Sequence, residues 1–448
     1  MLVANRGEIA VRIIRACREL GIETVLAASG IDRDSLAAEL ADRAVAIGPS
    51  PARASYLNVP LVVQAALSTG CDALHPGYGF LSERAELATT CEENGITFVG
   101  PRSDTIRALG DKLSARELAR HAGVPMVPGT ARLENVREAR TAASEIGFPV
   151  VMKASAGGGG RGMFVASDAA AIDVSFDRAS NEAREAFGDG SLYLERYVER
   201  ARHVEVQILG DGAGKVVHVG ERDCSAQRRY QKVIEEAPCV VMSDAARAGL
   251  HAAAVQLTSS VAYRNAGTVE FIFDLDREAF YFMEVNARIQ VEHPVSEAVS
   301  GLDLVGWQLR IAAGEPLTLE QSAVVLRGHA IECRINAEDA SVDFRPSPGR
   351  ISRWVPPAGE GIRLDSYCRT GTFVPPYYDS MIGKLIAFGV DRPAALERMR
   401  RALDEFEIEG IRTNVPFQRY VVAHPDFVRN EITTGWLERT VLPSFTQS

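Results

Sequence analysis

The sequence lacks a long hydrophobic run, a paired-cysteine motif and any stretch of low complexity. Its seven cysteines among 448 residues are odd in number and scattered, without a CxxC, which indicates reduced thiols rather than a disulfide framework. No apolar run approaches the length that spans a bilayer. Asn5, Arg6 and Glu8 interrupt the amino terminus at once, so it does not read as a signal peptide. We therefore expect a cytoplasmic protein that does not enter a membrane.

Positive charge is also in short supply. The formal net charge is −10 and the isoelectric point is about 5.5, which argues against general binding of nucleic acid or of an anionic membrane surface. Arg228, Arg229 and Lys232 form a local basic cluster against this acidic background. Residues 221–232 are too polar for a core strand and have no helical periodicity, so we expect a strand followed by a loop that projects cations. A small bound anion is as compatible with this cluster as a solvated run of charges.

The first hundred residues alternate short apolar strands with helices. Strands are expected at residues 2–4, 24–28, 44–47, 73–75 and 97–99, and helices at 9–20, 35–42, 59–68 and 83–93. This alternation is typical of a parallel, doubly wound sheet. Ligands of such sheets gather at the strand carboxyl ends, where residues 75–79 follow a strand, although a plain turn explains them equally well.

The rest of the chain indicates an α+β organisation. Residues 100–125 read as a linker that carries one helix, at 114–121. Further strands are expected at 148–153, 163–166 and 191–198, then long strand pairs around 203–222 and 268–286, with helices at 244–262 and 302–313. Residues 327–445 read as another α+β unit that ends in a helix near 392–406.

The most informative segment runs from Phe280 to Pro294. Charged and amide side chains at alternate positions would share one face of a strand: Glu284, Asn286, Arg288, Gln290 and Glu292. Residues 268–273 read as the partner strand, which places Glu270 opposite Glu284. Two facing carboxylates repel, and a hard divalent cation bound through oxygen relieves the repulsion. A solvated face of an exposed hairpin is the alternative, and the aromatic and aliphatic neighbours disfavour it.

A glycine-rich segment, residues 157–160 with Gly162, lies between two expected strands. Successive glycine amides can form a nest for phosphate oxygens, but the segment fails both the Walker A and the GxGxxG patterns. A flexible hairpin loop is the alternative. Lys153 favours phosphate because it ends an apolar run, where an unpaired ammonium is costly.

Other candidate residues are weaker when taken singly. Lys112 follows Gly110-Asp111 and reads equally as a surface lysine that starts a helix. Glu195, on an apolar strand, is either a ligand of adenine or ribose or an exposed edge residue. Arg334, on an alternating strand, suits an oxyanion or a structural ion pair. His203 and His293 read as satisfied core histidines.

Taken together, these segments resemble biotin carboxylase, the ATP-grasp component of biotin-dependent carboxylases. The matching blocks are residues 4–10, 75–83, 110–112, 153–163, 221–238, 284–294, 334–338 and 375–384. The resemblance implies an N-terminal Rossmann-like (pre-ATP-grasp) domain at 1–109, an ATP-grasp domain at 110–314 and a C-terminal biotin carboxylase domain at 327–445. Residues of about 126–197 would be a lid that closes over ATP.

The resemblance also implies three groups of site residues. The residues that match ATP-binding positions are Lys112, Lys153, Gly158, Gly159, Gly160, Glu195, Val198, His203 and Gln227. The residues that match the Mg²⁺ (or Mn²⁺) site are Glu270, Glu284 and Asn286. The residues that match the bicarbonate and biotin pocket are Tyr78, Lys232, Arg288, Gln290, Val291, Glu292 and Arg334.

The implied reaction is the ATP-dependent carboxylation of biotin. Glu292 would deprotonate bicarbonate as it attacks the γ-phosphate, while magnesium and Lys232 offset charge on the transferring phosphoryl group, and Arg288 counts among the catalytic residues. Carboxyphosphate would break down to CO2 and phosphate, the phosphate would deprotonate biotin N1, and Arg334 would stabilise the ureido oxygen. The implied partners are a biotin carboxyl carrier protein, the carboxyltransferase of an acyl-CoA carboxylase in fatty acid biosynthesis, and a second copy of the chain.

Three departures from the family pattern keep two alternatives open. The chain starts a few residues late, Ala156 replaces the first of five glycines, and Tyr230 stands where histidine is common near the nucleotide. The sequence also has no Ala-Met-Lys-Met biotinylation site, so the carrier is expected on another chain or on a segment cut away. The alternatives are another ATP-grasp carboxylate ligase and a catalytically weak nucleotide-binding regulator.

Overall fold

The N-terminal region is a parallel sheet wrapped by helices. The structure is a computed structural model that describes residues 1–155 and 163–445. The sheet order is β3-β2-β1-β4-β5, and its strands are β1 (Leu2–Val3), β2 (Val25–Ala28), β3 (Arg43–Ala46), β4 (Ala73–His75) and β5 (Thr97–Phe98). The helices between them are α1 (Gly7–Glu19), α2 (Leu36–Leu40), α3 (Val59–Ser68) and α4 (Ala85–Glu93). The predicted doubly wound sheet is confirmed.

Two turns at the carboxyl ends of β1 and β4 are joined by one side chain. The Asn5 amide donates to the carbonyls of Pro76 (2.7 Å) and Tyr78 (2.8 Å). Gly77 between them has φ +63°, and a Cβ there would lie 2.9 Å from Asn5 Nδ2, so glycine is required. The turn at residues 75–79 is thereby fixed against the start of α1.

The expected linker after β5 is more helical than predicted. It contains α5 (Ser103–Gly110) as well as α6 (Lys112–His121). The sequence interpretation missed α5 because that helix is short. Asp111 ends α5 and also caps α6, its side chain accepting from the Ser114 amide. Lys112 therefore lies at the first position of a helix.

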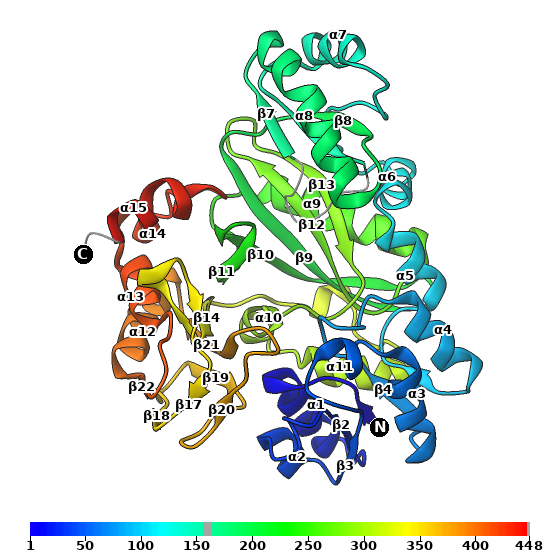
Figure 1. Ribbon diagram of the computed structural model, residues 1–448, viewed down its shortest axis with the longest axis vertical. Coiled ribbons are helices and arrows are strands. Elements are labelled where there is room, and N and C mark those ends of the chain that lie inside the picture. The colour runs from blue at the N-terminus through cyan, green and yellow to red at the C-terminus, as the bar shows by residue number, and fades with distance from the viewer. Residues whose placement is uncertain (156–162, 446–448) are drawn as a thin grey trace.

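A three-stranded antiparallel sheet with two helices forms the upper end of the molecule in Figure 1. Its strands, in the order β7-β6-β8, are β6 (Val150–Ala154), β7 (Met163–Ala166) and β8 (Leu192–Arg196), and its helices are α7 (Val136–Ile146) and α8 (Ala169–Phe187). Val150, Met152 and Leu194 on the sheet pack with Ile172 and Ala179 on α8 in a small core of their own. The predicted strands at 148–153, 163–166 and 191–198 are confirmed to within two residues.

The centre of the molecule is one eight-stranded antiparallel sheet, in the order β13-β12-β9-β10-β11-β14-β21-β19. Its strands are β9 (Ala201–Asp211), β10 (Val216–Arg228), β11 (Gln231–Ala237), β12 (Arg264–Asp274), β13 (Ala279–Asn286), β14 (His329–Asn336), β19 (Ile362–Ser366) and β21 (Met381–Gly389). Because β11 pairs with β14, strands of residues 110–314 and of residues 327–445 share this sheet. The three domain boundaries themselves stay a prediction.

Helices cover the central sheet and build the C-terminal end. They are α9 (Asp244–Ser260), α10 (His293–Ser300), α11 (Leu304–Ala312), α12 (Arg392–Glu405), α13 (Val415–Ala423), α14 (Pro425–Val428), the π-helical η4 (Leu437–Val441) and α15 (Leu442–Phe445). The expectation that the last unit ends in the helix near 392–406 is wrong, because helical segments continue to Phe445.

Short elements complete the chain. The paired strands are β15 (Glu338–Asp339) with β16 (Arg345–Pro346), β17 (Gly349–Arg350) with β20 (Phe373–Val374), and β18 (Arg353–Val355) with β22 (Glu407–Glu409). The 3-10 segments are η1 (Ala52–Ala54), η2 (Gln321–Ala323) and η3 (Ala340–Val342). All seven cysteines are buried and unpaired. Among the described residues, no helix combines the length and the apolar character needed to cross a bilayer.

Candidate active site

The hairpin of β10 and β11 delivers the central cation of the site. Arg229 and Tyr230 form its turn with φ +49° and +62°, as a two-residue hairpin turn requires. Lys232 therefore lies on β11, opposite Gln227 of β10, and its side chain is only 12% exposed. The prediction of a loop that projects cations is wrong for Lys232, because the turn is shorter than expected and the lysine points into the protein.

Three carboxylates surround the Lys232 ammonium. Its Nζ lies 2.5 Å from Glu205 Oε2, 3.0 Å from Glu270 Oε1 and 2.6 Å from Glu292 Oε1. Burial alone would lower the pKa of Lys232, but these negative charges outweigh it and raise the pKa well above its usual value. Lys232 is therefore a permanent cation, and it holds strands β9 and β12 against the start of α10.

Glu292 is held between two cations. Its second oxygen, Oε2, accepts from Arg334 Nη2 at 3.0 Å, and the residue is fully buried. Burial would raise the pKa of Glu292, but Lys232 and Arg334 outweigh it, and the pKa lies below its usual value despite the charge of Glu205. Glu292 is thus a buried carboxylate that is ionised at neutral pH, which is the state a proton acceptor needs.

The predicted strand face at residues 284–292 is only partly correct. Strand β13 ends at Asn286, a loop carries Arg288 and Gln290, and Glu292 is the residue before α10, with Pro294 in the first helical turn. Proline is favoured in that first turn, so Pro294 was the sequence signal for a helix start that the strand interpretation passed over. The loop still brings the expected side chains together, by a different backbone path.

The side chains of this loop converge on Glu270. Asn286 Nδ2 and Gln290 Nε2 both donate to Glu270 Oε1, at 2.8 and 3.2 Å. Arg288 donates to Gln290 Oε1 (2.8 Å) and Asn286 Oδ1 (3.1 Å), and its Nε lies 2.9 Å from Glu83 Oε2. Glu83 belongs to the N-terminal region and was not predicted. Arg288 therefore connects that region to the loop.

Glu270 and Glu284 are direct cross-strand partners on β12 and β13, as predicted. Burial raises the pKa of Glu284, and the charge of Glu270 raises it further. This repulsion between the buried Glu270 and the half-buried Glu284 fits a hard divalent cation, and the Asn286 side chain contacts Glu270 beside them. Oxygen donors of this kind suit magnesium or manganese rather than a soft metal.

Two other groups have ligand atoms within 4.8 Å of one another: His203, Glu205 and Glu270, and Glu205, Cys224 and Glu292. In each group the Lys232 ammonium already contacts two of the carboxylates. A cation there would compete with that ammonium for two carboxylates, whereas in the pair of Glu270 and Glu284 the ammonium contacts one carboxylate, that of Glu270. Glu270 and Glu284 are therefore the better metal pair.

The predicted nucleotide residues fall into two clusters. In the first, Lys153 of β6 and Arg116 of α6 both form ion pairs with the buried carboxylate of Glu195 on β8. Arg116 was not predicted. The phosphate interpretation of Lys153 thus competes with a structural pair, since Glu195 already balances its charge.

In the second cluster, His203 and Gln227 adjoin the metal pair. His203 Nε2 lies 3.0 Å from Glu270 Oε2, and its Nδ1 lies 2.6 Å from the Gln227 amide. The Lys112 charge reaches Glu284 and opposes the rise of its pKa. Val198 is a buried residue just after β8. Gly158, Gly159 and Gly160 lie outside the described residues.

Arg334 and Val291 border the opposite side of Glu292. Arg334 Nε donates to Glu235 Oε1 at 2.6 Å while Nη2 reaches Glu292. The Val291 carbonyl accepts from the buried Lys384 Nζ at 2.8 Å. The Tyr78 ring centroid lies 5.8 Å from that nitrogen. Lys384 therefore connects Val291 with Tyr78, and Arg334 contacts the Glu292 carboxylate directly. The assignment of Val291, Tyr78 and Arg334 to bicarbonate and biotin stays a prediction.

Several charged residues of the site were not predicted: Glu83, Arg116, Glu205, Arg222, Glu235 and Lys384. Arg222 is fully buried and donates to Glu205 (2.5 Å), Gln207 (2.8 Å), Ser296 (2.9 Å) and Thr268 (3.0 Å). A usable signal existed on β9, where His203, Glu205 and Gln207 alternate with aliphatic residues, as on β13. No comparable pattern marks Arg116 or Glu83.

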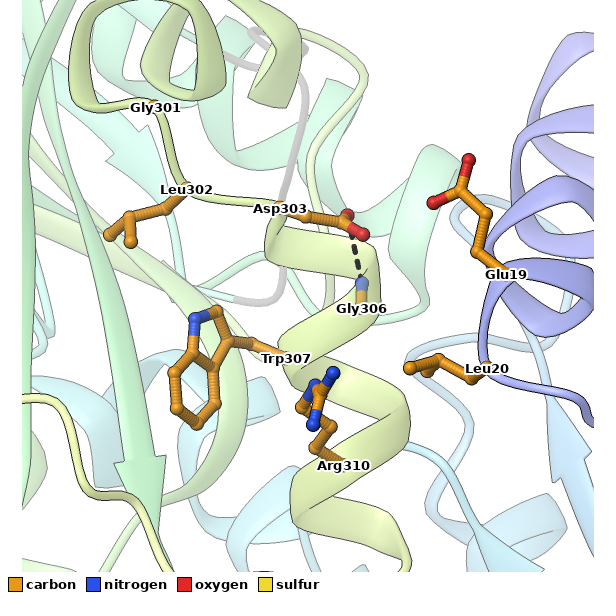
Figure 2. Close-up of a pocket in the computed structure, with 8 residues that line it drawn as sticks. All are labelled: Glu19, Leu20, Gly301, Leu302, Asp303, Gly306, Trp307 and Arg310. Atoms are coloured by element: carbon orange, nitrogen blue, oxygen red, sulfur yellow. Dashed lines mark hydrogen bonds between the residues drawn. The ribbon is translucent and has the colours of Figure 1, made fainter.

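A surface pocket of about 440 Å³ lies elsewhere, between the end of α1 and α11 (Figure 2). Figure 2 shows Glu19 and Leu20 on one side and Trp307 and Arg310 on the other, with Asp303 hydrogen-bonded to the Gly306 amide. The pocket shares no lining residue with the charged cluster. It is therefore not the candidate active site.

Three sequence families match the chain in succession. Residues 1–106 match "Biotin carboxylase, N-terminal domain", residues 111–320 match "Carbamoyl-phosphate synthase L chain, ATP binding domain", and residues 332–439 match "Biotin carboxylase C-terminal domain". These matches cover most of the chain.

Curated and solved relatives are similar over nearly the whole length. The chain is 52% identical to Biotin carboxylase 1 of Bacillus subtilis over 439 residues, 98% of each chain. A biotin carboxylase–β,γ-ATP complex from Campylobacter jejuni is 44% identical, with a TM-score of 0.92 and 98% of each chain covered. The biotin carboxylase domain dimer of Hydrogenobacter thermophilus 2-oxoglutarate carboxylase, with MgADP, ADP and bicarbonate, is 46% identical, with a TM-score of 0.90 over 98% of this chain and 96% of that one.

Proposed function

The chain belongs to the biotin carboxylase family, and from that premise we propose how its own residues carry out the reaction. The reaction is ATP-dependent carboxylation of biotin by bicarbonate, with magnesium as the metal. We assign the chemistry to the cluster of Lys232, Glu292 and Arg334. The observation that carries this assignment is Glu292, a buried, ionised carboxylate held between two cations.

In the first step, Glu292 acts as the base. Bicarbonate enters between Lys232, Arg288 and the 290–292 loop, and its hydroxyl proton passes to the Glu292 carboxylate. The freed oxygen attacks the γ-phosphorus of ATP, the bond to ADP breaks, and carboxyphosphate forms. A positioned base contributes about 10²- to 10⁴-fold to such a step.

Lys232 and Arg288 stabilise the negative charge that develops. Both are fixed before substrate arrives, Lys232 by its carboxylates and Arg288 by Glu83, Asn286 and Gln290, so little reorganisation is needed. Glu270, Glu284 and Asn286 would hold the divalent cation, which when bound neutralises charge on the ATP phosphates.

In the second step, Arg334 stabilises biotin as it reacts. Carboxyphosphate breaks down to CO2 and phosphate, the phosphate takes the proton from biotin N1, and N1 then attacks CO2. Negative charge moves to the ureido oxygen, which the Arg334 guanidinium stabilises. Glu235 holds the guanidinium through Nε, so this contact can remain while biotin binds. Nη2 would then release Glu292 and contact the ureido oxygen of biotin.

We assign nucleotide binding to the two clusters beside this centre. Lys153 would exchange Glu195 for phosphate, and Glu195 and the Val198 backbone would hold the adenosine part. His203, Gln227 and Lys112 adjoin the metal pair and would face the phosphates. The contact of His203 with Glu270 supports this arrangement, which the glycine segment at 158–160 would complete.

The proposed partners follow from the chemistry. Carboxybiotin must leave on a biotin carboxyl carrier protein, and a carboxyltransferase of an acyl-CoA carboxylase would use it. The dimeric relative from Hydrogenobacter thermophilus supports a homodimer. Seven unpaired cysteines support a reducing compartment such as the cytoplasm.

The test is ADP release by the purified chain with each substrate omitted in turn. We expect turnover that requires magnesium, bicarbonate and biotin together. Stimulation by another carboxylic acid in place of bicarbonate would favour another ATP-grasp ligase, and ATP binding without turnover would favour a regulator.

A further inference from the structure

Two buried glutamates, Glu235 and Glu332, face each other beside Arg334. They are direct partners in the antiparallel pair of β11 and β14, and both are fully buried. Directly opposed residues have Cβ atoms about 4.5–5.5 Å apart. Arg334 lies two residues after Glu332 and so shares its face of β14, whereas Ile331, Cys333 and Ile335 pack into the hydrophobic core on the other face.

The two carboxyl groups are poorly satisfied as anions. Glu235 Oε1 accepts from Arg334 Nε at 2.6 Å. Glu235 Oε2 and both oxygens of Glu332 have no hydrogen-bond partner within residues 1–155 and 163–445. Two ionised carboxylates side by side in a buried site repel strongly, and one of them then binds a proton.

The charged groups around the pair cannot neutralise both carboxylates. Lys384 of β21, Arg334 of β14, Lys232 of β11 and Glu292 before α10 face it. Lys232 already contacts three carboxylates, Arg334 is shared with Glu292, and Lys384 donates to the Val291 carbonyl and pairs with Glu8 at 3.3 Å. Each cation is therefore engaged elsewhere or shared.

The direction of the pKa values agrees with the geometry. Burial raises the pKa of Glu332 well above its usual value. The positive charges of Lys384 and Arg334 lower that pKa, and the negative charges of Glu235 and Glu292 raise it. Burial likewise raises the pKa of Glu235 to about 7, with Glu292 adding to the rise and Arg334 and Lys232 opposing it. Because Glu235 accepts from Arg334 while neither oxygen of Glu332 has a hydrogen-bond partner among the described residues, the proton is held more firmly on Glu332.

We propose that Glu235 and Glu332 are positioning residues for Arg334 and share one proton, with Glu332 as the neutral acid and Glu235 as the anion. The proposal rests on the proposed function, in which Arg334 stabilises the biotin ureido oxygen. The neutral acid lets Glu235 stay ionised without repulsion, and Glu235 then fixes the guanidinium by its Nε. When the pH rises above the pKa of Glu332, the proton is lost, a second anion appears beside Arg334, and biotin carboxylation declines.

Infrared difference spectroscopy tests the shared proton without turnover. At neutral pH the wild-type protein should show the carbonyl stretch of a protonated carboxylic acid that is missing in Glu332→Gln. The band should persist in the control Glu236→Gln, which removes a buried carboxylate from the same strand but from its other face. Equal band intensity in wild type and Glu332→Gln would overturn the proposal.

Kinetics test the positioning role. Glu235→Gln should raise the KM for biotin about 10-fold, the loss expected for one charge-assisted hydrogen bond, and leave the KM for ATP unchanged. Glu332→Gln, which mimics the neutral acid, should match wild type at neutral pH and move the alkaline limb of kcat/KM for biotin to higher pH. Loss of activity in Glu332→Gln equal to that in Glu235→Gln, or an unchanged pH profile, would overturn the proposal.

The wild-type protein provides a check that needs no variant. Its acid carbonyl band should disappear over the same pH range in which kcat/KM for biotin falls, and a band that persists beyond that range would contradict the proposal. If wild type shows no biotin-dependent turnover at all, the proposed function fails, whereas the infrared difference still reports on the shared proton.

Discussion

At the scale of single residues, the site works because charges constrain one another. Glu292 is fully buried, and a lone carboxylate in that position would bind a proton, yet Lys232 and Arg334 hold it ionised. Lys232 is in turn kept charged by Glu205, Glu270 and Glu292. The ionisation state that each residue needs for its role therefore depends on the other charged residues of the cluster.

Replacing the two opposed glutamates by glutamines, which carry no charge, tests the assignment of the metal site. Glu270→Gln combined with Glu284→Gln should raise the magnesium concentration needed for half-maximal activity at least 10-fold, because two anionic ligands are lost. A magnesium titration of ADP release measures it. Glu83→Gln is the matched control, since Glu83 contacts Arg288 but is not an assigned metal ligand. An unchanged titration in the double variant would refute the hairpin site.

Residue-level prediction from sequence succeeded where charges interrupt an apolar pattern. Lys153, Glu270 and Glu284 all do so, and all lie in the charged clusters. Lys232 comes from a polar run instead, and its placement in a loop was wrong. Glu83 and Arg116 could not be found in this way, because they lie near helix starts where charged residues are ordinary. Their roles depend on contacts between distant segments, which a local pattern does not encode.

At the scale of elements, the sequence predicted the ends of some helices and strands accurately and misplaced the ends of others. Helix α3 and strands β4 and β7 match the prediction at both ends. The end of β13 was misplaced because charged residues continue its alternation through a loop. Alternation alone does not distinguish a strand from a loop whose side chains converge on one acid.

The three-stranded sheet of β6, β7 and β8 is predicted to bind ATP through Lys153. Lys153→Met should raise the KM for ATP about 10-fold and change the KM for bicarbonate little, because Lys153 lies with Glu195 and Arg116 rather than in the Lys232 cluster. Initial-rate kinetics with each substrate varied measure the two constants. Lys215→Met, which removes a lysine paired at the surface with Glu320, is the control. An equal rise in both constants would place Lys153 with the bicarbonate residues instead.

Glu236 should anchor β11 to the C-terminal helices in a pH-dependent way. Its carboxylate pairs with Arg392 of α12 at 2.7 Å and with His329 at 2.8 Å. Burial would raise the pKa of Glu236, but these partners outweigh it and lower the pKa from 4.5 to about 2. The stabilisation is therefore complete above pH 4.5 and is lost as the pH falls toward about 2.

Urea unfolding of Glu236→Gln measures that contribution. The variant should be less stable than wild type by about 3 kcal/mol at pH 7, and the difference should narrow at pH 4. Glu407→Gln, which breaks an exposed pair with Arg353, should change stability by less than about 1 kcal/mol. A difference between wild type and Glu236→Gln that does not depend on pH would contradict the assigned ion pair.

At the scale of the whole molecule, one sheet joins two regions that the sequence suggested as separate domains. Strands β11 and β14 pair across the expected boundary, and Arg334 and Glu235 of the site stand on these two strands. The site is therefore assembled by the sheet itself. Sequence patterns place strands along the chain but do not give their order across a sheet, so this junction was not predicted.

Hydrogen exchange should report the shared sheet. Amides of β11, β14 and β21 should exchange together and last, because each of these strands is paired on both sides within one hydrogen-bonded sheet. Amides of β6, β7 and β8 should exchange earlier, since their small core is separate. Mass spectrometry of peptides after timed exchange measures both sets. Clearly different protection of β11 and β14 would contradict a single cooperative unit.

The most direct test of the central claim is the transfer of label from radioactive bicarbonate to biotin, measured in wild type and in Glu292→Gln. With MgATP, wild type should form labelled carboxybiotin, and the variant should form it at least about 10²-fold more slowly while it binds ATP with nearly unchanged affinity. Labelling by Glu292→Gln at close to the wild-type rate would contradict the account.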